Sequence, residues 1–392
     1  MILGLAPMDW VTDYPYRIIV EEIFKKYWDS KNTLRKWTEF MSADGYMINP
    51  SRLVKHLIKD QTEQQLIAQI YGGNIDTLIK TTQDIEKKYP GFFGIELNIG
   101  CPSPKVLSCG AWAGMMRNKT KTLEYIKLLS ESTTLPFSIK TRSWLNEQDK
   151  KDQFQFIIDA AKYCKTISIH GRTYSQAHNG TVDRDFIYNI KKEVWNDCTI
   201  IGNGGINSYD DCELQKGNLD GIMIWQSAIS NPRIFTNHIP SKDEKIEISK
   251  KHLLLMAAYE IYMNHTRTLY PEMSDQLALN RQNLHINKKY DPNSDEFMDI
   301  PSIDFHDYIF PMPDHQNIID YVRLIEDNII RWEKNINFWQ FEYNINDLRC
   351  GIDFRKYVFG YIKWYDNTKD IKQALINTKD ISEIYNIIQN FK

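Results

Sequence analysis

Short apolar runs alternate with longer segments of helical period from residue 1 to about residue 238. This alternation is typical of βα units, which build a parallel sheet. Polar residues stand at the carboxyl end of nearly every apolar run, as in closed barrels that keep their chemistry at that end. We therefore predict an α/β fold, a (β/α)₈ TIM barrel. Its eight expected strands span residues 2–6, 36–41, 66–71, 94–98, 137–141, 166–170, 199–202 and 221–225.

The strand pattern stops after Asn231 and Pro232. Beyond this point, residues 246–266, 316–335 and 371–391 carry aliphatic and aromatic side chains at helical spacing. We expect a barrel domain over residues 1–238 and a smaller all-helical domain over residues 239–392. Residues 270–313 are rich in Asp, Asn, Pro and Ser without periodicity, which predicts an irregular insertion.

Composition narrows the possible partners. A net charge of -3 gives no general attraction to phosphates, so any contact with nucleic acid must come from local basic clusters. The six cysteines form no C-x-x-C pair, which indicates reduced thiols and no structural metal. The sequence contains neither a signal peptide nor a long apolar segment. We expect a cytoplasmic monomer that binds no membrane.

Polar side chains end five consecutive predicted strands, the third to the seventh: Gln69, Asn98, Lys140, His170 and Asn203. In a barrel these side chains meet at one mouth, where a planar polar cofactor fits. Lys140 and His170 can donate hydrogen bonds to the electron-rich edge of an isoalloxazine and stabilise its reduced, anionic form. The Gln69 amide can pair with a ring carbonyl and a ring N–H. The set predicts a flavin site.

Two loops after strands add to this prediction. Asn203, Gly204 and Gly205 follow a buried strand and offer backbone N–H groups for a phosphate, although a simple turn explains the same residues. Cys101 lies on a loop bracketed by prolines. An unperturbed thiol has a pKa of about 8.5, so it is protonated at neutral pH and suits a general acid. A buried structural cysteine is the alternative for Cys101.

Several segments recur in the order found in one enzyme family. They are Ala6-Pro7-Met8, Thr38-Glu39, Gln69-Ile70-Tyr71-Gly72, Asn98-Ile99-Gly100-Cys101-Pro102, Lys140-Thr141-Arg142, His170-Gly171-Arg172-Thr173, Asn203-Gly204-Gly205 and Phe354-Arg355-Lys356. The sequence resembles tRNA-dihydrouridine synthases, and the resemblance covers most of the chain outside the insertion.

The resemblance implies FMN at the barrel mouth, reduced by NADPH or NADH, which passes hydride to C6 of a flipped-out uracil in tRNA. Cys101 would protonate C5, Asn98 and Arg172 would face the uracil, and Arg355 and Lys356 would contact the tRNA. The residues implied to hold the flavin are Ala6, Pro7, Met8, Gln69, Lys140, His170, Asn203, Gly204, Gly205, Trp225 and Gln226.

Tryptophans stand where this family has glycine, at Trp10, Trp112, Trp144, Trp225 and Trp364. Trp225 and Gln226 replace a Gly-Arg pair beside the flavin phosphate, so a charge-assisted contact is lost. One hypothesis is that the source organism reads UGA as glycine and that these codons were translated as tryptophan. A UGG codon at any of these positions would refute it there, and Trp37, in an ordinary aromatic context, is a control.

Two other functions stay open. If the tryptophans are genuine, they plug the site and leave a flavin-free RNA-binding or structural barrel. A flavin-dependent dehydrogenase acting on a small molecule shares the same flavin-holding residues but needs no RNA-binding domain. Stimulation of flavin oxidation by tRNA separates the last possibility from a tRNA-modifying enzyme.

Overall fold

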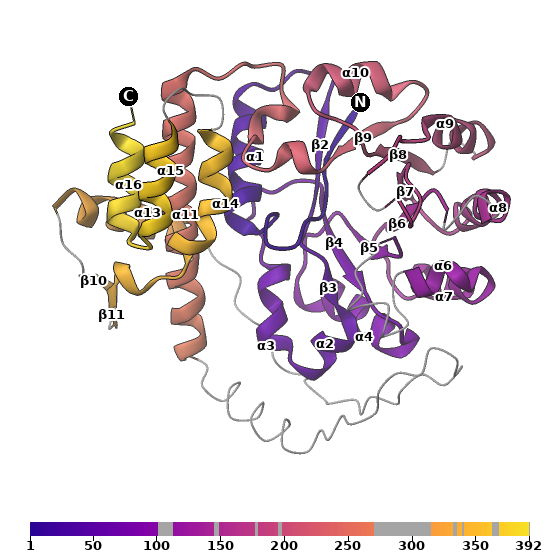
Figure 1. The fold of residues 1–392 in the computed structure, drawn as a ribbon. Helices are drawn as coiled ribbons and strands as arrows, with labels where there is room; N and C mark the ends of the chain where they lie inside the picture. The colour runs from indigo at the N-terminus through magenta and orange to yellow at the C-terminus, as the bar shows by residue number, and fades with distance from the viewer. Residues whose placement is uncertain are drawn as a thin grey trace.

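Eight parallel strands close into a barrel in the computed structural model (Figure 1). The structure describes residues 1–100, 113–144, 149–176, 179–194, 198–269, 315–331, 335–338, 341–362 and 368–391. The strand order is β2-β1-β9-β8-β7-β6-β5-β4, and a pairing between β2 and β4 completes the ring. The strands are β1 (Ile2–Leu5), β2 (Thr33–Trp37), β4 (Leu66–Tyr71), β5 (Gly94–Asn98), β6 (Phe137–Arg142), β7 (Thr166–His170), β8 (Thr199–Asn203) and β9 (Gly221–Ile224). The predicted barrel is confirmed.

The second strand lies earlier than predicted, over Thr33–Trp37 instead of residues 36–41. A short strand, β3 (Met41–Ser42), follows it beside β4. The apolar pattern did not predict this strand, because β2 contains two charged residues that are buried and have partners. Lys36 forms ion pairs with Glu21 and Glu63, and Arg35 donates to Thr166 Oγ1 over 3.2 Å.

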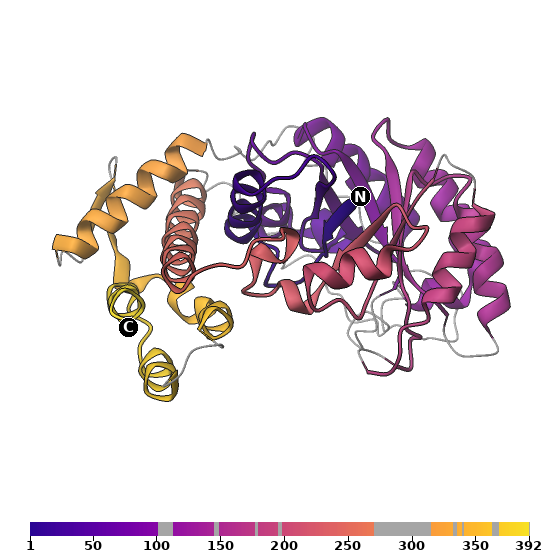
Figure 2. The same cartoon turned by 90° about the horizontal axis from the view of Figure 1, so that it is seen from above.

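Helices cover the outside of the barrel (Figure 2). Each of the helices α1, α4, α7, α9 and α10 begins at an Asp, Asn or Ser whose side chain accepts from a backbone N–H in the first turn, which satisfies donors that the helix leaves free. The surrounding helices are α1 (Tyr14–Lys26), α2 (Ala43–Ile48), α3 (Pro50–Leu53), α4 (Ile75–Lys88), α6 (Ala113–Arg117), α7 (Lys119–Glu131), α8 (Lys150–Ala160), α9 (Arg184–Glu193) and α10 (Tyr209–Lys216).

A small cluster of apolar side chains packs together within the barrel. Its buried members come from β2, β4, β8 and β9 and from the residue after β1: Ala6, Trp37, Ile67, Ile201 and Met223. Trp37 is fully buried, and a Cβ atom at Gly4 would lie 3.1 Å from its Cζ3 atom. Glycine at position 4 therefore makes room for the indole.

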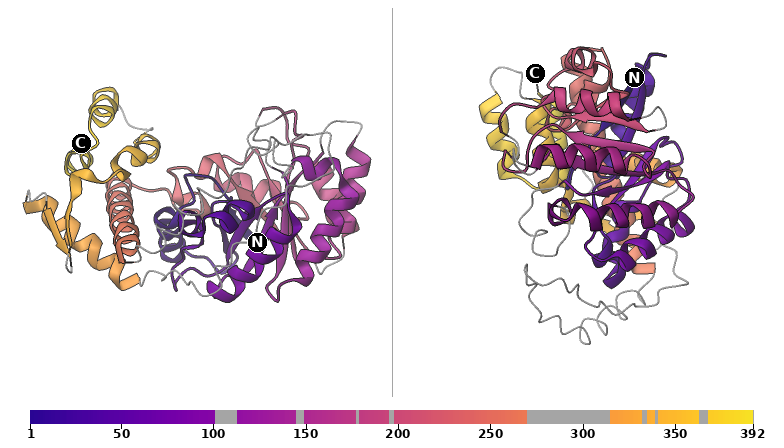
Figure 3. Two further views of the ribbon diagram at one scale, coloured as in Figure 1. Left: turned by 90° about the horizontal axis from the view of Figure 1, so that it is seen from below. Right: turned by 90° about the vertical axis from the view of Figure 1, so that its right-hand side faces the viewer.

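The carboxyl-terminal region is mainly helical and lies on one side of the barrel, beside α1 (Figure 1, Figure 3). A hairpin of β10 (Asn335–Phe338) and β11 (Phe341–Asn344) interrupts it, so Asn335 is not helical as predicted. The predicted helix 371–391 is two helices, because Asp380 caps a new one. The helices are α11 (Lys242–Leu269), α13 (His315–Arg331), α14 (Cys350–Tyr361), α15 (Thr368–Asn377) and α16 (Ile381–Gln389). The expected insertion, residues 270–313, lies outside the described residues.

An aromatic cluster joins α1, α11 and α14. His252 of α11 is fully buried, and its ring lies 5.4 Å from Tyr16 of α1 and 4.3 Å from Tyr357 of α14. Burial is the main reason that the pKa of His252 falls to about 3, so its ring is neutral. Among the described helices, none combines the length and apolar character needed to cross a membrane.

Candidate active site

The polar residues predicted from the strand ends lie on neighbouring strands at the carboxyl end of the barrel. Asn98 of β5 pairs in register with Lys140 of β6, and His170 of β7 pairs with Asn203 of β8. Gln69 of β4 is held beside Asn98 by a hydrogen bond of 3.0 Å. Lys140 is half-buried, whereas the other four side chains are buried. The structure therefore brings all five to one mouth.

A buried carboxylate lies below them. Gln69 Oε1 accepts from Asn98 Nδ2, and Gln69 Nε2 donates to Glu96 Oε1 over 2.6 Å. Burial raises the pKa of Glu96 to about 7, against the opposing effects of the Gln69 hydrogen bond and the Lys140 charge. These bonds fix which end of the Gln69 amide is the donor. Sequence reasoning missed Glu96, although it stands two residues before Asn98 and so faces the same side of the strand.

Arg142 fixes the backbone that leads into the Cys101 loop. Its guanidinium is buried and donates to Gly100 O over 2.8 Å and to Thr173 O over 3.0 Å. It therefore ties the end of β5 to the loop after β7. Cys101 itself lies outside the described residues. Arg142 could have been found from its spacing, since it faces inward two residues after Lys140.

The turn after β8 carries three backbone amides without an acceptor among the described residues. Gly204 and Gly205 have φ values of +108° and +68°, a region that favours glycine. Their N–H groups and that of Ile206 donate to no acceptor in the described part of the chain. A Cβ atom at Gly204 would lie 2.8 Å from His170 Cδ2. We refer to these three amides as the nest. Free backbone N–H groups can bind an anionic group, and phosphate binding at these residues stays a prediction.

The segment after β1 is held from several sides. Ala6 N–H donates to Ile224 O over 3.0 Å, and Met8 N–H donates to Thr12 Oγ1 over 2.9 Å. The buried Arg17 donates to Thr12 O over 2.8 Å. Ala6, Pro7 and Met8 are all buried. This segment, which is implied to hold the flavin, therefore presents a rigid backbone.

Trp10 stands on the same loop with φ of +62°, and its side chain is 60% exposed. Its N–H donates to Glu39 Oε1 over 2.6 Å, and its carbonyl accepts from Lys356 Nζ and Tyr357 OH. A positive φ is the backbone expected at a glycine position.

The other tryptophans at expected glycine positions differ from Trp10. Trp144 is buried against Phe186, and Trp225, whose φ is -116°, is half-buried against the interior cluster. Neither has a positive φ. Gln226, beside Trp225, is exposed. Trp112 and Trp364 lie outside the described residues. Among the described positions, the left-handed backbone at position 10 supports the glycine hypothesis, and the ψ of -104° at Trp225 also lies outside the regions favoured by residues with a Cβ atom.

The residues expected to contact RNA differ in their surroundings. Arg172 is half-buried near His170, with 3.4 Å between its Nη1 and His170 Nε2. On α14, Arg355 Nη2 donates to Thr378 O over 2.6 Å, and Lys356 donates to the Trp10 carbonyl. Both helical residues therefore have partners within the chain.

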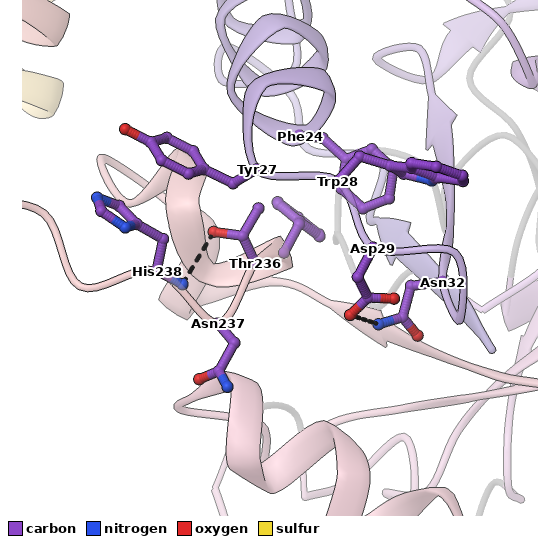
Figure 4. A pocket seen from close by; sticks show the side chains of 9 residues that line it. Phe24, Tyr27, Trp28, Asp29, Asn32, Thr236, Asn237 and His238 are labelled. Carbon is purple, nitrogen blue, oxygen red and sulfur yellow. Dashed lines mark hydrogen bonds between the residues drawn. The ribbon is translucent and has the colours of Figure 1, made fainter.

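A cavity of about 330 Å³ lies away from the barrel mouth (Figure 4). It is lined by the end of α1, the connection to β2 and the segment after η4 (Pro232–Phe235), including Phe24, Trp28, Asn32 and His238. The α1–β2 connection enters the strand at its amino end, opposite the mouth. The cavity therefore takes no part in the polar site described above.

Residues 4–297 match the family model described as dihydrouridine synthase. A probable tRNA-dihydrouridine synthase of Helicobacter pylori is 28% identical over 257 residues, which cover 64% of this chain and 74% of that protein. A tRNA-dihydrouridine(20/20a) synthase of Shewanella oneidensis is 28% identical over 240 residues, 58% of this chain and 68% of that protein. Among solved structures, mandelate oxidase has a TM-score of 0.37 and 12% identity, covering 59% of this chain and 66% of that chain.

Proposed function

Because the chain belongs to the dihydrouridine synthase family, we propose that it reduces uridines in tRNA to 5,6-dihydrouridine with bound FMN and NADPH or NADH. The observation that carries the proposal is the convergence of Gln69, Asn98, Lys140, His170 and Asn203 at one barrel mouth beside a nest of backbone amides. The nest fits a phosphate, and the neighbouring amide and cationic side chains fit the polar edge of a flavin. A tRNA substrate also implies a cytoplasmic enzyme.

The residues would divide the work as follows. FMN, when bound, would supply the hydride that reaches C6 of the uracil. Gln69 would hold the pyrimidine edge of the flavin by its free N–H and carbonyl lone pair, while Lys140 and His170 would place positive charge and hydrogen bonds at that edge. The amides of Gly204 and Gly205 would bind the phosphate.

The substrate side of the site would use other groups. Asn98 and Arg172 would orient the uracil, and the Cys101 thiol would deliver a proton to C5, a role worth roughly 10²–10⁴ in rate for a general acid. Arg142 would set the start of the Cys101 loop through its bond to Gly100. The base must leave its stack to reach this mouth, and α14 would support the folded RNA through phosphate contacts.

The test is the flavin spectrum of the purified protein, followed by incubation with unmodified tRNA and NADPH and detection of dihydrouridine by mass spectrometry. We expect bound FMN whose oxidation is accelerated by tRNA. Cys101→Ala should keep the flavin and its reduction by NADPH but slow the tRNA-dependent step. A parallel protein with glycine at positions 10, 112, 144, 225 and 364 tests whether the tryptophans weaken the site.

Two results would refute the proposal. Bound flavin that is oxidised equally fast with and without tRNA would indicate a dehydrogenase acting on a small molecule. Absence of flavin from both proteins would indicate a flavin-free barrel. Both outcomes are measured on the same preparations.

A further inference from the structure

Arg184, the first residue of α9, lies behind the glycine turn that follows β8. Its Nη2 donates to Gly204 O over 2.5 Å, and Gln215 Nε2 donates to Gly205 O over 3.2 Å. Both carbonyls of the turn are therefore held by side chains of the surrounding helices. The N–H groups of the same peptides point the opposite way and have no acceptor in the described part of the chain.

The charge of Arg184 is not neutralised by a direct ion pair. No carboxylate of the described residues lies within ion-pair distance of it, and its Nη1 is buried without a hydrogen-bond partner in the same part of the chain. Burial lowers the pKa of Arg184, and so does the neighbouring Arg172 guanidinium, whereas Tyr188 and Asp211 act in the opposite direction. A cation in this position is stabilised by an anion.

An anion bound to the amides of the nest would stabilise the charge of Arg184. The nest is accessible, since Gly205 is exposed and Gly204 half-buried. Gln226, on the neighbouring turn, brings no charge to it. We infer that Arg184 is a positioning residue for the phosphate of the flavin, because it holds the Gly204 carbonyl of the nest and supplies positive charge behind it. This inference rests on the proposed function.

The experiment compares FMN with riboflavin, which carries the same ring without the phosphate. Dissociation constants for both are measured by quenching of flavin fluorescence in the wild-type protein, in Arg184→Gln and in Arg184→Lys. We expect Arg184→Gln to weaken FMN binding roughly tenfold or more and to leave riboflavin binding within about twofold. Arg184→Lys keeps the charge, and its dissociation constant for FMN should lie between those of the wild type and Arg184→Gln. Lys191→Gln, on the same helix but paired with Asp220, is the matched control and should change neither constant.

The outcomes are distinct. Equal weakening of FMN and riboflavin would mean that Arg184 only supports the fold, and unchanged FMN binding would mean that it does nothing for the phosphate; either result overturns the inference. If the wild-type protein binds neither flavin, the proposed function fails as well. A second measurement needs no variant: inorganic phosphate should compete with FMN but not with riboflavin, and its failure to compete with FMN contradicts a phosphate site at the nest.

Discussion

Replacing Trp10 tests whether its backbone is strained. The residue has φ of +62°, and its peptide groups are held by Glu39 on one side and by Lys356 and Tyr357 on the other, so the loop cannot rotate freely. Two variants separate the causes. Trp10→Ala removes the indole and keeps a Cβ atom, whereas Trp10→Gly removes both.

The expected magnitudes follow from the contacts. A left-handed conformation costs a residue with a Cβ atom about 1–2 kcal/mol, and glycine avoids this cost but loses more entropy on folding, about 0.5–1 kcal/mol. Trp10→Gly should therefore be more stable than Trp10→Ala by roughly 1 kcal/mol. The indole is 60% exposed, and Lys55 Nζ lies 4.9 Å from its ring centroid. Such an exposed cation–π contact is worth about 0.5–1 kcal/mol. The free energy of unfolding of the wild type should thus be close to that of Trp10→Gly and higher than that of Trp10→Ala.

The assay is urea unfolding of the three proteins followed by circular dichroism. Trp37→Gly is the control, because that indole is fully buried in the barrel and its loss should cost at least 3–5 kcal/mol. Equal stability of Trp10→Ala and Trp10→Gly would refute the strain argument. The codon at position 10 is an independent check: UGA would agree with a glycine position, and UGG would refute the translation hypothesis there while leaving the strain measurement unaffected.

Three further predictions concern buried charges. Arg17→Met should cost about 3–5 kcal/mol in urea unfolding because it leaves buried Glu63 without its 2.9 Å partner, whereas Lys162→Gln, at an exposed pair, should leave the midpoint unchanged. The depressed pKa of His252 means that the unfolded chain binds more protons between about pH 3 and 6.5; stability should therefore fall as pH drops below 6.5, and His252→Phe should flatten this dependence. The effect of Glu96 on the pH dependence of stability has the opposite sign. Its raised pKa makes the folded chain bind more protons between about pH 4.5 and 7, so the wild type should lose stability relative to Glu96→Gln as pH rises through this window; a constant difference across it would contradict the placement of the carboxyl group.

The sequence predicted the barrel well because its strands follow simple rules. The strands at Leu66–Tyr71, Gly94–Asn98 and Thr166–His170 lie where the apolar runs place them. The strand Thr33–Trp37 was misplaced because Arg35 and Lys36 are buried, and their burial depends on partners far away in the sequence. Local patterns carry no information about such partners.

The candidate site likewise contains residues that local sequence patterns predict and residues that they do not. Strand-end residues such as Lys140 and His170 could be found from the sequence, since their position relative to an apolar run is a local property. Arg184 could not, because it belongs to a helix and reaches the Gly204 turn only through the packing of α9 against β8. Its importance depends on which carbonyl it contacts and on the absence of a direct ion pair to it among the described residues. Neither follows from periodicity or composition.

Helix α14 links two places that would otherwise be independent. Lys356 and Tyr357 of this helix hold the carbonyls of Trp10 and Val11, on the loop that continues from Met8 at the barrel mouth. The next residue towards the amino end, Arg355, is a proposed RNA contact. A partner that binds α14 can therefore affect the mouth through three hydrogen bonds. Free-energy coupling of this kind is reciprocal, so a ligand bound at the mouth also changes the affinity of α14 for its partner.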